Sequence, residues 1–246
     1  MRLDEKTALV TGGASGFGAG IARRFLEEGA RVMIADLNVE AAEAMAGVLG
    51  CAWTGGDVGL DPDVAEIAKA ALAEFGQIDI LVNNAGITHL PQALEDVSED
   101  EFDRVLRVNA KSVYLTARHL VPAMKTRGAG AILNIASTAG LSPRPKLNWY
   151  NASKGWMITA TKTMAVELAP FGVRVNALCP VAGETPLLKS FMGEDNPEMR
   201  AKFLATIPLG RFSTPQDMGS AAAFLCSDDA AMITGAALEV DGGRCI

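Results

Sequence analysis

Tyr150 and Lys154 stand four residues apart in a segment with helical periodicity that runs to about Ala169. Side chains at this spacing share one face of a helix. A free tyrosine has a pKa of about 10, so proton transfer near neutral pH requires the phenolate to be stabilised by about 2–3 pKa units. A neighbouring ammonium group favours the phenolate in this way. The pair therefore indicates acid–base chemistry, although the same spacing is also common on ordinary helices.

Ser137 stands upstream of this pair, at the end of an apolar run over residues 131–135. Such runs are typical of buried strands. Ligands of α/β proteins bind at the carboxyl edge of the sheet, where a residue at the end of a strand lies. We therefore expect the Ser137 hydroxyl to hold a substrate oxygen beside Tyr150.

A glycine-rich segment follows the first apolar run, residues 8–10, and leads into a helical segment. Glycines at such a turn let the backbone approach a pyrophosphate, whose charge is stabilised by the positive end of the helix. A glycine cluster alone is weak evidence, because any turn from strand to helix uses glycine. The strand before it and the helix after it strengthen the interpretation. The candidate phosphate-binding residues are Gly12, Ser15, Gly16, Phe17 and Gly18.

Asp36 ends the second apolar run and is followed by Leu37. A carboxylate at this place can accept hydrogen bonds from both adenosine ribose hydroxyls and repels a 2′-phosphate. No Arg or Lys stands among residues 13–15 or 37–38 to receive such a phosphate. The sequence therefore predicts NAD rather than NADP as the cofactor. The alternative is that Asp36 only ends a strand.

The elements that must position these residues alternate along the chain. Runs typical of strands occupy residues 8–10, 31–35, 78–82, 131–135, 173–177 and 237–240. Helix start signals lie between them, at Asp61-Pro62, Ser98–Glu101 and Ser213–Gln216. Alternation of strand and helix requires right-handed parallel crossovers. We therefore expect an α/β fold, a Rossmann-type doubly wound parallel sheet flanked by helices, in one domain over residues 1–246.

The segment from Pro180 to Pro208 departs from this alternation. It contains four prolines, two glycines and an amphipathic piece over residues 186–192. A long insertion after a strand is where α/β proteins place elements that cover a ligand. The sequence predicts a substrate lid at about residues 181–208, with a surface excursion as the alternative.

Composition and charge exclude several classes of protein and of binding partner. Of 246 residues, 49% are hydrophobic and 21% charged, which excludes a disordered chain, a coiled coil and a collagen-like repeat. The net charge of −7 and the lack of a basic run argue against a nucleic acid or a membrane surface as partner. No run of 18 apolar residues and no signal-peptide pattern occurs, so we expect a cytoplasmic protein. The four cysteines lack CxxC spacing and only two His are present, which argues against disulfides and a metal site.

Together these motifs resemble those of the single-domain short-chain dehydrogenase/reductase family. The motifs that carry the resemblance are Thr11-Gly12-xxx-Gly16-x-Gly18, Asn83-Asn84-Ala85-Gly86, Ser137 and Tyr150-xxx-Lys154, in the order and at the spacing of the family. They cover the chain nearly from end to end. The resemblance implies an oxidoreductase with a seven-stranded sheet, usually assembled as a homotetramer.

The resemblance also implies roles that spacing does not show. Asn109 matches the helix asparagine that supports a water linking Lys154 to solvent, so the implied catalytic set is Asn109, Ser137, Tyr150 and Lys154. Lys154 also binds the nicotinamide ribose in the family, and the pair Asp57-Val58 resembles the one that contacts adenine. Beyond the glycine-rich segment, the implied cofactor-binding residues are Asp36, Leu37, Asp57, Val58, Asn84, Ala85, Gly86, Tyr150, Lys154, Pro180, Val181, Gly183 and Thr185.

One position departs from the family pattern. After the sixth strand, family members usually read Pro-Gly with a Thr a few residues on, whereas this chain has Val181 in the glycine position. A β-branched residue restricts the backbone there. This puts in question whether Thr185 reaches the nicotinamide carboxamide.

Residues that flank these motifs are candidates for contacting a small-molecule substrate. They are His89, Ser137, Arg144, Trp149 and Met192. Packing explains Trp149 equally well, and Arg144, like Lys146, can be a solvated loop charge. His89 can donate a hydrogen bond to the substrate or cap the next helix.

Three activities remain open at this point. The first is NAD-dependent interconversion of a secondary alcohol, or a polyol or sugar hydroxyl, and its ketone, with Tyr150 as general acid/base. The second is reduction of 3-oxoacyl groups on acyl carrier protein, which is usually NADPH-linked and uses a basic docking face. Asp36 opposes it, as does Phe171, which stands where such reductases often keep an Arg. The third is a dinucleotide-binding sensor subunit, which has no physical need for Ser137, Tyr150 and Lys154 together.

Overall fold

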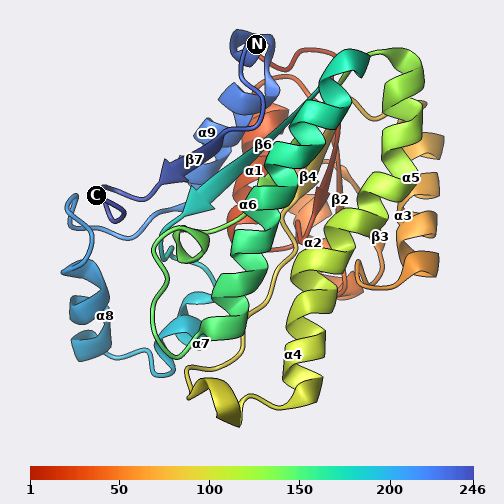
Figure 1. Cartoon of the computed structure of the whole chain (residues 1–246). Coiled ribbons are helices and arrows are strands. Elements are labelled where there is room, and N and C mark those ends of the chain that lie inside the picture. The colour runs from red at the N-terminus through yellow and green to blue at the C-terminus, as the bar shows by residue number, and fades with distance from the viewer.

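Seven strands form one parallel sheet at the centre of the computed structural model, which describes residues 1–246 (Figure 1). Their spatial order is β3-β2-β1-β4-β5-β6-β7 and every neighbouring pair is parallel. The strands are β1 (Thr7–Thr11), β2 (Arg31–Asp36), β3 (Ala52–Gly55), β4 (Ile80–Asn83), β5 (Gly130–Ile135), β6 (Val173–Pro180) and β7 (Ala237–Val240). The predicted doubly wound parallel sheet is confirmed. Its order reverses between β1 and β4, and α/β proteins bind their ligands at such a switch point.

Helices cover both faces of the sheet, so the central strands are apolar on both sides. One face packs against α1 (Gly16–Glu27), α2 (Val39–Leu49) and α9 (Pro215–Cys226). The other packs against α3 (Asp61–Phe75), α5 (Ser112–Arg127) and α6 (Asn148–Leu168). The helix α4 (Glu99–Leu106) continues into α5 through a π-helical turn, Arg107–Lys111. None of the helices combines the length and apolar character needed to cross a lipid bilayer.

Two of the three predicted helix starts are confirmed. Ser98 accepts a hydrogen bond from the Glu101 N–H at the start of α4, and Thr214 forms a capping box with Asp217 at the start of α9. The prediction for Asp61 is wrong, because α3 begins at Asp61 itself and its N-cap residue is Leu60. The Asp61 carboxylate instead binds His119 Nε2 at 2.8 Å, across to α5.

The edge strand β3 is absent from the apolar runs that the sequence predicts as strands. It contains Trp53, Thr54 and Gly55, and none of its residues is fully buried. The strand exists because its backbone pairs with β2, with Met33 opposite Ala52 and Asp36 opposite Gly55. Only the resemblance to the family indicated a seventh strand.

The segment predicted as a lid contains two short helices, α7 (Leu188–Met192) and α8 (Pro197–Leu204). The sequence indicated the amphipathic piece that became α7 but not α8. The segment and the residues that follow it have an apolar cluster of their own, which consists of Val181, Leu188, Met192, Ile207 and Phe212. Figure 1 shows both helices beyond the carboxyl ends of β6 and β7, on the side where the chain ends.

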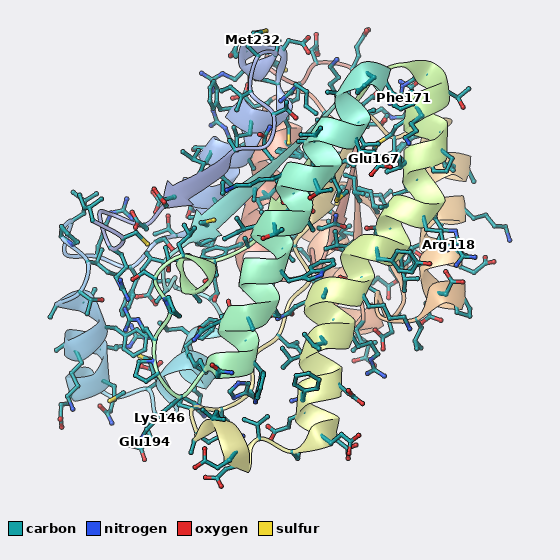
Figure 2. All side chains as sticks on the ribbon, in the orientation of Figure 1. Arg118, Lys146, Glu167, Phe171, Glu194 and Met232 are labelled. Atoms are coloured by element: carbon teal, nitrogen blue, oxygen red, sulfur yellow. The ribbon has the colours of Figure 1, made fainter.

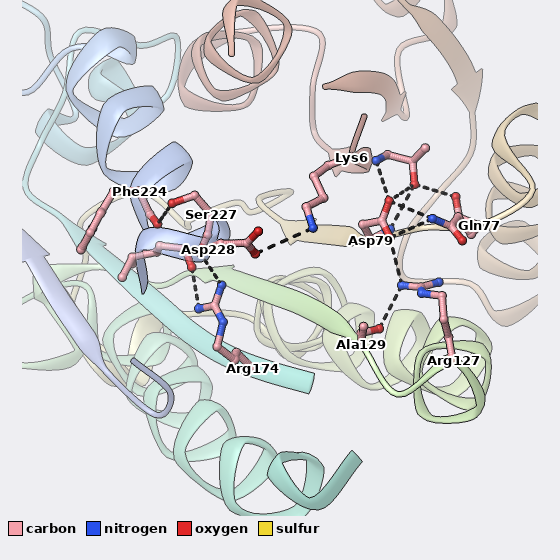
Figure 3. A network of polar contacts seen from close by, with 11 residues as sticks. Lys6, Gln77, Asp79, Arg127, Ala129, Arg174, Phe224, Ser227 and Asp228 are labelled. Carbon is pink, nitrogen blue, oxygen red and sulfur yellow. Dashed lines mark hydrogen bonds and ion pairs between the residues drawn. The ribbon is translucent and has the colours of Figure 1, made fainter. Parts of the chain in front are cut away.

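Polar contacts fasten the opposite, amino end of the sheet (Figure 3). Asp79, just before β4, accepts hydrogen bonds from the backbone N–H and the hydroxyl of Thr7 at the start of β1 and pairs with Arg127 at 3.3 Å. Arg174, near the start of β6, donates to the carbonyl oxygens of Leu225, in the last turn of α9, and Ser227, directly after it. These contacts join strands and helices far from the carboxyl edge.

Candidate active site at the carboxyl edge of the sheet

A cavity of about 720 Å³ lies where the strands end at the switch point. It collects predicted residues from all parts of the chain. Those that line it are Gly12, Ser15, Gly16, Phe17, Asp36, Leu37, Asp57, Val58, Asn84, Ala85, Gly86, Ser137, Arg144, Tyr150, Lys154, Pro180, Val181, Gly183 and Thr185. Gly18, Asn109, His89, Trp149 and Met192 are not among its lining residues.

The glycine-rich turn leaves a cradle free of side chains at the start of α1. Gly12 and Gly16 have φ values of +63° and +53°, which L side chains rarely adopt. A Cβ on Gly18 would come 2.2 Å from the Gly12 carbonyl oxygen, so the close packing of the turn against α1 requires glycine at this position. The first N–H groups of α1 face this cradle, and Ser15 makes no side-chain cap bond. The shape and the positive helix end fit the phosphates of a dinucleotide.

Asn84 fastens the segment after β4 to this turn. Its Nδ2 donates to the carbonyl oxygens of Thr11 and Gly12, both at 2.9 Å. The Thr11 hydroxyl accepts from the N–H groups of Asn84 and Ala85. The two loops on either side of the switch point are therefore one hydrogen-bonded unit.

Asp36 lies at the β2 side of the cavity. Its carboxylate accepts from the N–H groups of Ala14 and Asn38, at 3.1 and 3.0 Å. The only basic residues that line the cavity are Arg144 and Lys154, and both belong to the half beyond β5. The end of the cavity at Asp36 thus offers hydrogen-bond acceptors and no cation, which fits a ribose with free hydroxyls better than one with a phosphate.

Tyr150 and Lys154 lie on α6 with 4% of each residue exposed. Burial raises the pKa of Tyr150 to about 12, and the neighbouring Ser137 side chain partly opposes this effect. Burial lowers the pKa of Lys154 to about 8. The Lys154 ammonium donates to the Ile135 carbonyl oxygen at 2.8 Å and lies 5.9 Å from the centre of the Tyr150 ring. Burial thus acts against both charged forms, a contribution that the sequence-based expectation of phenolate stabilisation did not include.

Ser137 has the orientation needed to donate a proton. Its Oγ accepts a hydrogen bond from the Ala139 N–H at 3.0 Å, which occupies a lone pair of the oxygen. The hydroxyl proton is left for an oxygen atom in the cavity. The Ser137 and Tyr150 hydroxyls can therefore bind one substrate oxygen from two sides.

Asn109 lies in the π-helical turn and is completely buried. Its amide exchanges two hydrogen bonds with the backbone of Ile87, both at 2.9 Å, and donates to Ser153 Oγ on α6. A Cβ on Gly86 would lie 3.3 Å from Lys154 Nζ and 3.4 Å from Asn109 Oδ1, so these two groups flank the same glycine. Asn109 ties the segment after β4 to α6 and lies behind the cavity.

Three predicted substrate residues are held away from the cavity by packing. His89 is 1% exposed and its Nδ1 bonds the Leu90 carbonyl oxygen. Trp149 packs edge-on against Phe102, with ring centres 5.2 Å apart, and donates to the Leu94 carbonyl oxygen. Met192, at the end of α7, belongs to the apolar cluster of the segment that is predicted as a lid. Packing, the alternative given for Trp149, describes the placement of that side chain, whereas His89 caps no helix and bonds its neighbour's carbonyl oxygen instead.

Apolar side chains line the substrate half of the cavity. Leu147, Leu187, Phe191 and Phe203 belong to it, and the Phe191 ring lies edge-on to Tyr150 with centres 5.1 Å apart. Phe203 was missed from the sequence because α8 was not predicted. The signal that could have found it is Asn196-Pro197, an N-cap followed by proline at the first helical position.

Comparisons with known proteins agree with this arrangement. A family model described as enoyl-(acyl carrier protein) reductase matches residues 12–244. The chain is 51% identical to 4-formylbenzenesulfonate dehydrogenase of Comamonas testosteroni, with 99% of each chain covered. It is 42% identical to D-threitol dehydrogenase of Mycolicibacterium smegmatis, with 100% of this chain and 95% of that one covered.

The solved structures include a similar protein with a bound dinucleotide. It is a 3-ketoacyl-(acyl-carrier-protein) reductase from Brucella melitensis complexed with NADH, 51% identical, with a TM-score of 0.95 over 99% of this chain and 100% of that chain. The matches span nearly the whole chain and coincide with the motifs that meet in the cavity. The chain belongs to the short-chain dehydrogenase/reductase family of oxidoreductases.

Proposed function

We propose that the protein is an NAD-dependent oxidoreductase that interconverts a secondary alcohol, or a polyol or sugar hydroxyl, and its ketone by hydride transfer. The observation that carries the proposal is the meeting of Ser137, Tyr150 and Lys154 with the glycine cradle in one cavity. Relatives named as dehydrogenases of a formyl compound and of a polyol support the reaction class. The formyl compound also makes aldehydes part of the substrate range to be tested.

Two observations support NAD as the cofactor. The end of the cavity at Asp36 offers hydrogen-bond acceptors and is lined by no cation, and the similar Brucella protein binds NADH. Gly12, Gly16 and the first turn of α1 would hold the pyrophosphate. Asp36 would accept from the adenosine ribose, and Lys154 would bind the second ribose. The bound nicotinamide supplies the carbon that accepts or donates the hydride.

The protein's own residues would handle the proton. Ser137 donates a hydrogen bond to the substrate oxygen and positions it beside Tyr150, which takes the proton during oxidation and returns it during reduction. Lys154, four residues away on α6, favours the phenolate form. Leu187 and Phe191 line this half of the cavity, and exclusion of water by these side chains would strengthen the electrostatic interaction between Tyr150 and Lys154.

The test is the substitution Tyr150→Phe. A panel of secondary alcohols, polyols, hydroxy acids and aldehydes is first screened for NADH formation with the unaltered protein. Tyr150→Phe is then expected to lower kcat by about 10²–10⁴-fold while NADH binding, followed by fluorescence titration, is unchanged. Retained turnover would refute the role of Tyr150. A protein that binds NADH but converts no substrate at all would favour the sensor subunit.

The similar Brucella protein keeps reduction of 3-oxoacyl carrier protein as a second candidate. The surface around Phe171 does not favour it. The Lys125 ammonium lies 4.6 Å from the centre of the Phe171 ring, and Arg127 is engaged with Asp79 (Figure 2 marks Phe171). Turnover of acetoacetyl carrier protein with a kcat/KM above that of every small ketone would establish this second function.

We further propose a homotetramer. Tyr114 on α5 and Trp156 and Val166 on α6 are between 44% and 79% exposed and give these neighbouring helices an apolar outer surface. Burial of such side chains between subunits would stabilise an assembly. Sedimentation equilibrium that gives the mass of a single chain would contradict this proposal.

A further inference from the structure

Two arginines without a carboxylate partner meet at the substrate end of the cavity. Arg144 lines the cavity, its Nη2 donates to Thr206 Oγ1 at 2.7 Å, and its guanidinium lies 4.4 Å from the centre of the Phe203 ring. Arg244, near the end of the chain, donates to the hydroxyl of Ser142, another lining residue, at 3.0 Å. The ion pairs of the structure all involve other cations.

The placement of this pair costs energy as long as no anion is near. Burial of Arg144 and, to a smaller extent, the positive charge of Arg244 lower the pKa of the Arg144 guanidinium. The Nε of Arg244 is buried without a hydrogen-bond partner. A chain with 29 acidic residues places none of them within ion-pair distance of either guanidinium. Partly buried like charges are stabilised when an opposite charge joins them.

Apolar side chains line the cavity beside Tyr150 and beside Arg144. Leu147, Phe191 and Phe203 line it, and Phe203 also stacks on Arg144. The position of the Arg144 backbone is fixed relative to Tyr150, because Asn151, the next residue, donates a hydrogen bond from its Nδ2 to the Arg144 carbonyl oxygen at 2.8 Å. The cavity therefore presents a hydroxyl pair, an apolar stretch and a guanidinium in one connected space.

We propose that the substrate carries an oxyanion, a carboxylate or a sulfonate, at the end remote from the reacting carbon, and that Arg144 binds this group. The inference rests on the proposed function and names its substrate class. An aromatic or short aliphatic body fills the apolar stretch. A guanidinium binds either oxyanion through two parallel N–H donors, and Arg244 adds a second positive charge.

The experiment compares three ketones of similar shape, reduced with NADH: 4-acetylbenzoate, 4-acetylbenzenesulfonate and the uncharged 4-methylacetophenone. The unaltered protein is expected to reduce at least one of the acids with a higher kcat/KM than the neutral ketone. Arg144→Gln should lower kcat/KM for the acids by about 10–100-fold, the range of a charge-assisted hydrogen bond, and leave the neutral ketone within about threefold. For the acids, the kcat/KM of Arg144→Lys should lie between the values of the unaltered protein and of Arg144→Gln.

Lys146→Gln is the matched control. It removes the same charge from the same loop, but Lys146 is exposed and does not line the cavity (Figure 2). It should change none of the three rates by more than about threefold, because exposed charges interact weakly with a distant ligand. Thr206→Val removes the hydrogen bond to Arg144 but keeps the Arg144 charge, so it should preserve the preference for acids. If Arg144→Gln fails to fold, Arg244→Gln serves as the second charge removal and should weaken turnover of the acids alone.

Binding of benzoate, which has no carbonyl to reduce, separates this inference from the proposed function. Calorimetric titration of the NADH-loaded protein should show benzoate binding that Arg144→Gln weakens about tenfold or more. This result stands even if neither the three ketones nor any compound of the alcohol and aldehyde panel is converted, in which case the proposed function falls and the anion site remains. Equal kcat/KM values for acids and neutral ketone, or an equal loss for both in Arg144→Gln, would overturn the inference.

Discussion

Thr185 lies directly against Gly16: a Cβ placed on Gly16 would come 3.2 Å from the Cβ of Thr185. The first residues of the lid segment therefore touch the glycine-rich turn, although a valine occupies the position where the family usually has glycine. Val181 does not keep Thr185 from the cavity.

Gly16→Ala is expected to weaken NADH binding by about tenfold or more, because alanine is strained at a φ of +53° and its Cβ crowds Thr185. Gly47→Ala is the control, since Gly47 lies inside α2 with open space around it. That substitution should stabilise the helix by about 0.5–1 kcal/mol and leave NADH binding unchanged. Fluorescence titration with NADH measures both; equal affinities in the two variants would contradict the expectation.

Asp36→Ala combined with Leu37→Arg should shift the cofactor preference toward NADPH. The change removes the carboxylate that repels a 2′-phosphate and provides a guanidinium next to it. The ratio of kcat/KM for NADPH over NADH should rise by at least about tenfold, corresponding to ~1.4 kcal/mol. Asp57→Asn, on the same side of the cavity, tests whether loss of any carboxylate there suffices, and it should leave the ratio nearly unchanged.

Lys154→Met should stabilise the fold near neutral pH while it removes activity. The folded pKa of Lys154 is about 8 against an ordinary value of 10.5, so the unfolded chain binds this proton more tightly. The resulting penalty is fully present below pH 8 and disappears as pH rises toward 10.5. After allowance for the lost bond to Ile135, the gain in free energy of unfolding at pH 7 is about 2 kcal/mol.

Urea unfolding of both proteins at pH 7 and pH 9.5 checks this expectation. The stability difference between them should shrink at the higher pH. A variant less stable than the parent at pH 7 would show that burial of the ammonium group is not the dominant effect.

Val181→Ala should destabilise the protein by about 1.5–2.5 kcal/mol, because Val181 is 5% exposed within the apolar cluster of the segment that is predicted as a lid. The KM for the substrate should rise as well, since α7 and α8 rest on that cluster. Val166→Ala, at a 79% exposed site in α6, removes the same atoms and should change stability by less than about 0.5 kcal/mol. Thermal unfolding of the two variants decides between these values.

The sequence predicted the central strands and the cavity residues well because their signals are local. β1, β5 and β6 are rich in apolar residues and almost completely buried, and parallel strands bring the residues that follow them to one edge. The edge strand β3 lacks such a run because it is only half covered, and its pairing with β2 is a long-range property. Asp61 likewise has a cap-like sequence, but its contact with His119 depends on how α5 packs.

Side-chain direction was the part of the site that the sequence could not supply. His89 and Trp149 stand close to the cavity residues in sequence, yet packing turns them elsewhere. The effect of burial on the pKa of Tyr150 comes from distant segments, so the sequence could not supply it. Arg244 joins Arg144 from a part of the chain that no motif marked.

The position of Arg244 two residues from the exposed Ile246 has a practical consequence for protein production. A purification tag fused to the carboxyl terminus would attach beside the substrate end of the cavity. The amino terminus begins next to β1, at the amino end of the sheet (Figure 1). A tag fused there, before the exposed Met1, lies across the sheet from the cavity, so kinetic measurements are best made on protein with an untagged carboxyl terminus.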